Sequence, residues 1–191
     1  PQLKLRVIET GDIARVLPSN SILIEFQKYR PFKFDEPNDA LDVKNWGEPR
    51  YQALILEPSG NIKSIYLGLA KPIETQIQKA LVASEQGLAN AQQLWGQVSD
   101  LIIEPLSDVI ANNETLFISP DAELNRIPFA ALRSPKNNGL LTEDMSIRLV
   151  TTGRELLSLY KETESSPKSS LVVANPAFNP INSFLNKELD E

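Results

Sequence analysis

The pattern of apolar positions divides the first part of the chain into three predicted strands. Ser21–Gln27 is almost continuously apolar, which is typical of a strand buried on both faces for part of its length. The runs Tyr51–Glu57 and Ile62–Leu67 flank Pro58–Asn61, and this turn segment with its glycine predicts a β-hairpin. Together the three runs predict an antiparallel meander at one side of a mixed sheet.

Polar residues dominate the segments before and between these strands. Tyr29–Glu48 is rich in Pro, Asp and Asn, so we expect a long loop. Its aromatic residues Phe32, Phe34 and Trp46 either pin the loop to the body of the protein or, if exposed, mark a binding surface. Near the N-terminus, Asp12 is placed to cap a short helix that ends before a proline.

A period of three to four residues predicts two helices after the hairpin. Pro72 suits the first turn of the first helix, which turns these apolar positions to one face: Ile73, Ile77, Ala80 and Leu81. The second helix begins near Ala89 and carries a wider apolar stripe: Leu94, Trp95, Val98, Leu101 and Ile102. Pro105 must kink or divide this helix, because proline lacks the N–H of the helical hydrogen bond.

The stretch that follows combines a strand, a turn and a return to the core. Thr115–Ile118 is a short run of β-branched and apolar residues, which predicts a buried strand. Ser119-Pro120-Asp121 ends it, with Asp121 as a turn residue. Apolar positions then bring the chain back to the core: Leu124, Ile127, Phe129 and Leu132. Pro128 fits the first turn of a short helix.

The remaining residues alternate short predicted strands with one helix. Leu140–Leu141 and Ser146–Val150 read as strands, and Arg154–Tyr160 as a helix with Leu156, Leu157 and Tyr160 facing inward. Leu171–Ala174 is a hydrophobic run that predicts a strand ended by Asn175-Pro176, and we expect residues 177–191 to form a mobile tail. This order of strands and helices predicts an α/β fold with a layered sheet and flanking helices.

Composition and charge exclude several classes of function. The 191 residues carry a net charge of −6, which disfavours binding to nucleic acid or to an anionic membrane. No apolar run approaches the ~18 residues of a membrane span, and the first residues lack the apolar region of a signal peptide. We therefore expect one domain, residues 1–191, located in the cytoplasm.

The chain contains no His and no Cys, and this limits its chemistry. The absence removes the commonest general base, the commonest metal ligand and every thiolate site. The glycines form no phosphate-binding loop, and Asp39/Asp42 and Glu188/Asp190/Glu191 are typical of solvated acidic surface. We expect no cofactor, no metal and no catalytic residue within these 191 residues.

Arg154 has two interpretations, because the helix dipole disfavours a cation at a helix start. In one, its stem packs on the protein and its charge pairs with Glu155 or another acid. In the other, Arg154 is a buried anchor that holds the sheet edge or a segment outside this chain.

The stretch from Thr115 also carries a resemblance. It resembles the signature of the CHAT family, caspase-like domains that are often attached to tetratricopeptide repeats. The resemblance lies in Ser119-Pro120-Asp121, in Leu124-Asn125, and in Pro128-Phe129 followed by Leu132. This chain has no internal repeat. Further segments resemble the family in the same order: Ile22–Phe26, Arg50–Leu56, Gly153–Leu157 and Leu171–Pro176. The resemblance implies a caspase-like layered sheet and marks these structural motif residues: Pro120, Asp121, Asn125, Pro128, Phe129, Leu132 and Arg154.

One departure from the family decides what the resemblance implies. Its peptidase members use a His and a Cys, both C-terminal to the Ala-Asn-Pro segment, and this chain has neither. The implied function is therefore the N-terminal, non-catalytic portion of a caspase-like cysteine endopeptidase, which needs a C-terminal part carrying the dyad and acts on a protein substrate. By the same analogy, Asn175, Pro176 and Phe178 would form the rim of a substrate pocket. The alternative is a non-catalytic CHAT-like module for protein interaction or regulation.

A partner is expected for a physical reason as well. If Leu171–Ala174 is a core strand, the missing half of the domain leaves an unpaired apolar edge, which invites pairing. We therefore expect association with a C-terminal fragment, with the remainder of the same protein, or with a second copy of the chain.

Overall fold

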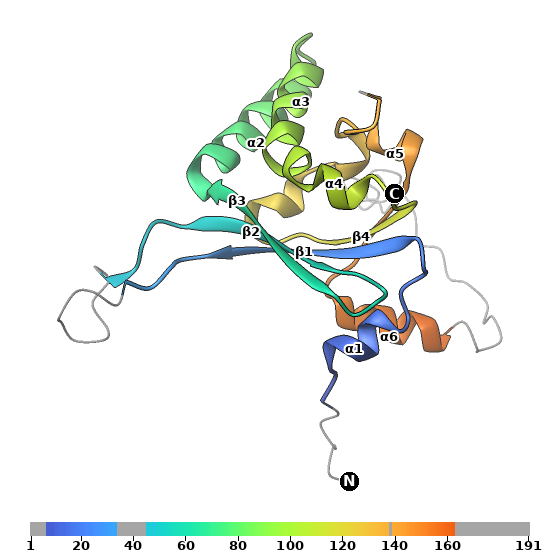
Figure 1. Cartoon of the computed structure of the whole chain (residues 1–191). Coiled ribbons are helices and arrows are strands. Elements are labelled where there is room, and N and C mark those ends of the chain that lie inside the picture. The colour runs from blue at the N-terminus through green and yellow to red at the C-terminus, as the bar shows by residue number, and fades with distance from the viewer. Residues whose placement is uncertain (1–6, 34–44, 138, 163–191) are drawn as a thin grey trace, which may run out of the picture.

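A mixed sheet with the strand order β3-β2-β1-β4-β5 forms the centre of the computed structural model (Figure 1). The structure describes residues 7–33, 45–137 and 139–162. The strands of this part are β1 (Ser21–Tyr29), β2 (Arg50–Leu56), β3 (Ile62–Leu69), β4 (Thr115–Ser119) and β5 (Ser146–Leu149). β1, β4 and β5 run parallel, whereas β1, β2 and β3 form an antiparallel meander. The predicted meander and α/β fold are confirmed.

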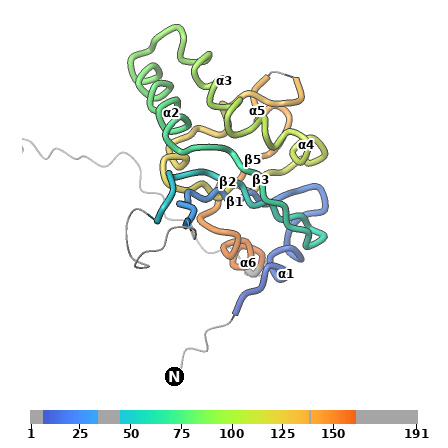
Figure 2. The backbone as a smooth tube through the Cα atoms, turned by 60° about the vertical axis from the view of Figure 1, so that its left-hand side comes forward, coloured from blue at the N-terminus to red at the C-terminus, as the bar shows by residue number. Residues whose placement is uncertain are grey.

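Helices cover both faces of the sheet, as Figure 2 shows. One face carries α2 (Ala70–Glu85), α3 (Ala91–Ile102), η2 (Glu104–Leu106), α4 (Ser107–Ile110), η3 (Ala122–Arg126), η4 (Phe129–Ala131) and α5 (Leu141–Asp144). The other face carries α1 (Thr10–Ala14) and α6 (Gly153–Glu162). Among the described helices, none combines the length and the apolar character that crossing a bilayer requires.

Two apolar cores lie on the two faces of the sheet, and β1 contributes to both. Ile22, Ile24 and Phe26 enter the larger core beneath α2 and α3. Leu23, between them, points to the opposite face and joins the smaller core with Leu156 of α6. Because successive side chains of a strand alternate between faces, a strand covered on both sides must be apolar at nearly every position. This explains the continuous apolar run of β1.

The two long helices form where the periodicity predicts them. Ile73, Ile77 and Ala80 of α2 are buried, and α3 buries Trp95, whose Nε1–H donates a hydrogen bond of 2.9 Å to Ser84 Oγ. The helical path is divided at the predicted proline: α3 ends at Ile102 and a short 3₁₀ turn, Glu104–Leu106, precedes α4.

Three local predictions are wrong. Asp12 lies inside α1 instead of capping it, and its carboxylate accepts a hydrogen bond of 3.2 Å from the N–H of Glu9. Leu140–Leu141 is not a strand: Leu140 forms an isolated bridge with Arg133, and Leu141 begins the helix α5, where the carboxylate of Glu143 accepts the N–H of Leu140. Tyr160 is 60% exposed and does not face inward.

The aromatic residues of the long loop contact each other. Phe32 and Trp46 form an isolated bridge between the continuations of β1 and β2, and their rings meet edge-on with centroids 5.1 Å apart. Trp46 is 43% exposed, so within the described residues the pair joins the two ends of the loop and does not bury them in the body. Phe34 lies outside the described residues.

Candidate functional site

The carboxyl ends of β1, β4 and β5 meet at one edge of the sheet, where open α/β folds place their sites. β4 ends at Ser119, whose Oγ donates a hydrogen bond of 2.9 Å to the carbonyl of Thr151 beyond β5. On the other side, Asp121 Oδ2 accepts the N–H of Lys28 at the end of β1, at 2.8 Å. The turn after β4 therefore ties the ends of three parallel strands together.

Asp121 also shapes the turn itself. Its Oδ1 accepts the N–H of Ala122 at 2.8 Å, and Ala122 has a φ of 49°, in the left-handed region that side chains rarely adopt. Asn125 Nδ2 donates to the carbonyl of Ala122 at 3.1 Å. Within the described residues, the side chains of Asp121 and Asn125 form these hydrogen bonds with the protein's own backbone, which is the behaviour of a turn and not of a catalytic group.

Replacing Asp121 with alanine should lower the free energy of unfolding by about 0.5–2 kcal/mol, the usual cost of losing a cap. Asp121→Asn, which keeps one acceptor oxygen, should lose less. Urea unfolding measures both. Glu123→Ala is the matched control, because Glu123 makes a half-exposed pair with Arg126 and its removal should change little. Equal losses in Asp121→Ala and Glu123→Ala would contradict the role of Asp121.

The residues after this turn anchor it in the larger core. Leu124, Ile127, Phe129 and Leu132 are all buried, as predicted. The ring of Phe129 stacks on Phe26 of β1 with centroids 5.8 Å apart and an interplanar angle of 24°. The short helix is a 3₁₀ turn, Phe129–Ala131, and the exposed Pro128 precedes it.

Beside the same edge lies a charged cluster that sequence reasoning missed. Glu74 Oε1 accepts the hydroxyl of Tyr51 at 2.9 Å and lies 2.6 Å from Lys28 Nζ. Tyr51 is fully buried. Its burial, and then the hydrogen bond to Glu74, raise the pKa of Tyr51 far above its ordinary value of 10.0. The phenol stays protonated and the lysine stays paired, so neither is an activated nucleophile or base.

The raised pKa of Tyr51 predicts a loss of stability in alkali. The unfolded phenol ionises near pH 10 while the folded one keeps its proton, so above pH 10 the unfolded state binds fewer protons and is favoured. The free energy of unfolding should then fall by up to about 1.4 kcal/mol per pH unit. Urea unfolding between pH 9 and 11 measures this slope. Tyr51→Phe should reduce it, whereas Tyr66→Phe, at a tyrosine that is 54% exposed, should not.

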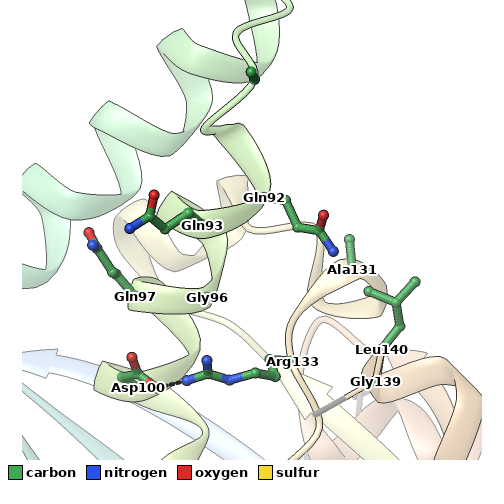
Figure 3. Close-up of a pocket in the computed structure, with 10 residues that line it drawn as sticks. Gln92, Gln93, Gly96, Gln97, Asp100, Ala131, Arg133, Gly139 and Leu140 are labelled. Atoms are coloured by element: carbon green, nitrogen blue, oxygen red, sulfur yellow. Dashed lines mark hydrogen bonds and ion pairs between the residues drawn. The ribbon is translucent and has the colours of Figure 1, made fainter.

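Two grooves open on the face of the sheet that carries α2 and α3. One, of about 760 Å³, lies next to the cluster between Lys28 and the first turns of α2, and includes Pro49, Leu69 and Lys71. The other, of about 560 Å³, lies between α3 and the segment that follows η4 (Figure 3). Its wall presents the amides of Gln92, Gln93 and Gln97 and an ion pair between Arg133 and Asp100. The amides and the ion pair of this second groove can donate and accept hydrogen bonds.

The structure bears on one of the two interpretations of Arg154. Its side chain is exposed, so the interpretation as a buried anchor is wrong. Glu155 Oε2 accepts the N–H of Thr151 at 2.7 Å, and within the described residues no ion pair involves Arg154. The neighbouring Gly153 is the residue that contacts the sheet, because its N–H donates to Glu25 Oε1 at 2.7 Å.

The predicted rim of the substrate pocket cannot be placed in the structure. Asn175, Pro176 and Phe178, the predicted strand Leu171–Ala174 and the tail 177–191 all lie outside the described residues. Among the residues that are described, no group of three acidic side chains is placed to hold a metal ion. The sequence had no signal for the clusters at Glu74 and Arg133, because their members come from elements far apart in the chain.

The sheet with helices on both faces defines an α/β domain of the caspase-like, layered class. A family model described as the CHAT domain matches residues 90–190, more than half of the chain. The chain belongs to the CHAT domain family, as the resemblance indicated. The match begins just before α3, so β1, β2 and β3 precede it although they belong to the same sheet. No curated protein matches the chain.

Proposed function

We propose that this chain is the N-terminal, non-catalytic portion of a caspase-like cysteine endopeptidase, and that a C-terminal part supplies the His/Cys dyad. The observation that carries the proposal is membership of the CHAT family in a chain of 191 residues without a single His or Cys. A cysteine peptidase needs a thiolate and a base to generate it. Neither can come from these residues, so the chain alone is inactive.

The role of this portion is to support the site. The edge formed by β1, β4 and β5 is rigid, because Ser119, Asp121 and Glu25 each join separate elements by hydrogen bonds of 2.7–2.9 Å. A rigid edge holds reacting groups in position better than a loop does. The proposal includes a protein substrate, on the family analogy. It also includes a cytoplasmic location, which agrees with the absence of cysteine and so of disulfides in the chain.

The test begins with the coding sequence beyond Glu191. A His and a Cys encoded there support the proposal, and their absence removes its peptidase part. The chain should then be expressed alone and joined to the encoded segment, and both proteins incubated with a peptide library. We expect cleavage only by the joined protein, and only while its Cys is intact. Cleavage by the 191-residue chain alone would contradict the proposal.

The proposal also assigns Asn175, Pro176 and Phe178 to the rim of the substrate pocket, on the family analogy. In the joined protein, Asn175→Ala and Phe178→Ala should each lower kcat/KM about tenfold, which corresponds to ~1.4 kcal/mol of lost transition-state binding. Leu88→Ala, at a residue that is 46% exposed and remote in the chain, is the control. Unchanged rates and unchanged cleavage specificity in both rim variants would refute this assignment.

A second candidate is a non-catalytic CHAT-like module that docks a partner. The observation that favours it is the groove of Figure 3, whose exposed amides and ion pair present recognition groups without a nucleophile. A joined protein that contains no His/Cys pair distinguishes the two candidates, because the peptidase candidate would then have no function. The module would still bind its partner, and Gln93→Ala together with Arg133→Ala would weaken that binding.

A further inference from the structure

An apolar groove of about 470 Å³ lies beside β5, on the face of the sheet that carries α1 and α6. Phe117, Val150 and Leu156 form its buried part. Leu149 of β5 and Leu159 of α6 line it as well, and they are 61% and 46% exposed. The groove is thus a continuation of the smaller core that the described residues leave uncovered.

The exposure of Leu149 and Leu159 indicates that another segment binds in the groove. Single exposed leucines are ordinary on a protein surface, but two that flank one apolar groove form a patch of the kind that marks an interaction site. β5 adds to this, because among the described residues it pairs only with β4. The groove therefore opens at an edge of the sheet where nothing in the described part covers it.

We propose that residues 171–174 of the same chain occupy this groove. The chain leaves the described part at Glu162, the end of α6, and α6 itself is one wall of the groove. Residues 163–170 are polar or proline, so Leu171-Val172-Val173-Ala174 is the next continuous apolar run. Its side chains have the chemistry and the size that a groove lined by Leu, Val and Phe accepts.

The lengths permit this contact. A connection made of residues 163–170 spans up to about 26–29 Å when it is extended. α6 has 10 residues and is therefore about 15 Å long, so the connection can return from its end to any point along α6, which is one wall of the groove. The tether also favours this occupant over a second copy, because a short linker gives an effective concentration on the order of mM.

The family match supports the same assignment. Its range, residues 90–190, includes β4, β5, α6 and residues 171–174, so these walls of the groove and its proposed occupant belong to one family unit, whereas Val16 and Pro18 of the lining precede it. The proposal does not depend on the peptidase function, since a non-catalytic module would bury the same apolar surface. If the groove proposal fails, the peptidase proposal still stands on its own test, and the reverse also holds.

The absence of cysteine makes a disulfide test clean. Leu149→Cys is combined with Val172→Cys or, to sample the other face of an extended segment, with Val173→Cys. Ile62→Cys combined with Val172→Cys is the matched control, because Ile62 is similarly exposed at 54% but lies on β3, at the opposite edge of the sheet. Mild oxidation is followed by non-reducing gels and intact mass, with circular dichroism as a check that each variant is folded.

We expect at least one Leu149 pair to form an intramolecular disulfide about tenfold faster, or more, than the Ile62 pair, because only close residues can be bridged. Leu159→Cys replaces Leu149→Cys if that variant does not fold. Equal rates in the test and control pairs would overturn the proposal, as would the absence of a disulfide in every pair. Dimers linked through Leu149→Cys would overturn it in favour of a second copy as the occupant.

Discussion

Phe129→Ala should lower the free energy of unfolding by about 3–5 kcal/mol, a large share of the stability of an ordinary domain. Phe129 is 2% exposed, and its ring stacks on Phe26 in the centre of the larger core. Truncation to alanine removes that burial and leaves a cavity between β1 and the segment after β4. Urea unfolding should show a lower midpoint with an unchanged m value.

Leu88→Ala is the control for this truncation. Leu88 is 46% exposed after the end of α2, so its loss should change the free energy of unfolding by less than about 0.5 kcal/mol. Similar losses for the two variants would mean that Phe129 does not anchor the turn. Asp121→Ala combined with Phe129→Ala should be non-additive, because both residues hold the same segment against β1.

Gly153→Ala should be destabilising by about 1–3 kcal/mol, although alanine is normally the better helix residue. A Cβ at this position would lie 2.5 Å from a methyl group of Leu23, 3.2 Å from Glu25 Oε1 and 3.4 Å from Ile13 Cδ1. The side chain must therefore displace Leu23 or push α6 away from β1. The N–H of Gly153, which donates to Glu25, would move with it.

Gly11→Ala is the matched control, because it is also a glycine in a helix on the same face. Its added Cβ meets nothing closer than 3.8 Å, so the change should leave stability unchanged or raise it by up to about 1 kcal/mol. The midpoint of thermal unfolding should therefore fall for Gly153→Ala and stay the same or rise for Gly11→Ala. An unchanged or raised midpoint for Gly153→Ala would show that the approach of α6 to β1 leaves room for a Cβ.

Most of the architecture could be predicted because buried positions recur with the period of each helix or strand in the sequence. β1 is apolar at nearly every position since both faces are covered, and α2 shows its buried face as Ile73, Ile77 and Ala80. The failures were local. Leu140–Leu141 has the composition of a strand, but a single carboxylate, that of Glu143, captures an N–H and begins a helix.

The candidate site was harder to predict, for a different reason. Lys28, Tyr51 and Glu74 belong to β1, β2 and α2, and nothing in the chain order says that one carboxylate will meet both partners. Arg154 attracted attention as a charge in an unusual place, whereas the contact with the sheet is made by Gly153, which has no side chain. Asp121 was correctly interpreted as a turn residue, because its role depends on adjacent backbone.

The placement of α6 limits how the sheet can grow. The connections from β1 to β4 and from β4 to β5 both pass over the face of α2 and α5, and both step outward in the same direction. Crossovers between parallel strands are right-handed in about 98% of cases. A right-handed crossover over the opposite face therefore places its next strand in the opposite direction, from β5 back toward β4. α6 lies on that opposite face, and the inward positions of the described sheet are already filled by β4, β1, β2 and β3. Parallel winding by right-handed crossovers therefore stops at β5, and a segment that returns from α6 to the groove beside β5 can cover the sheet there without extending it as a further parallel strand.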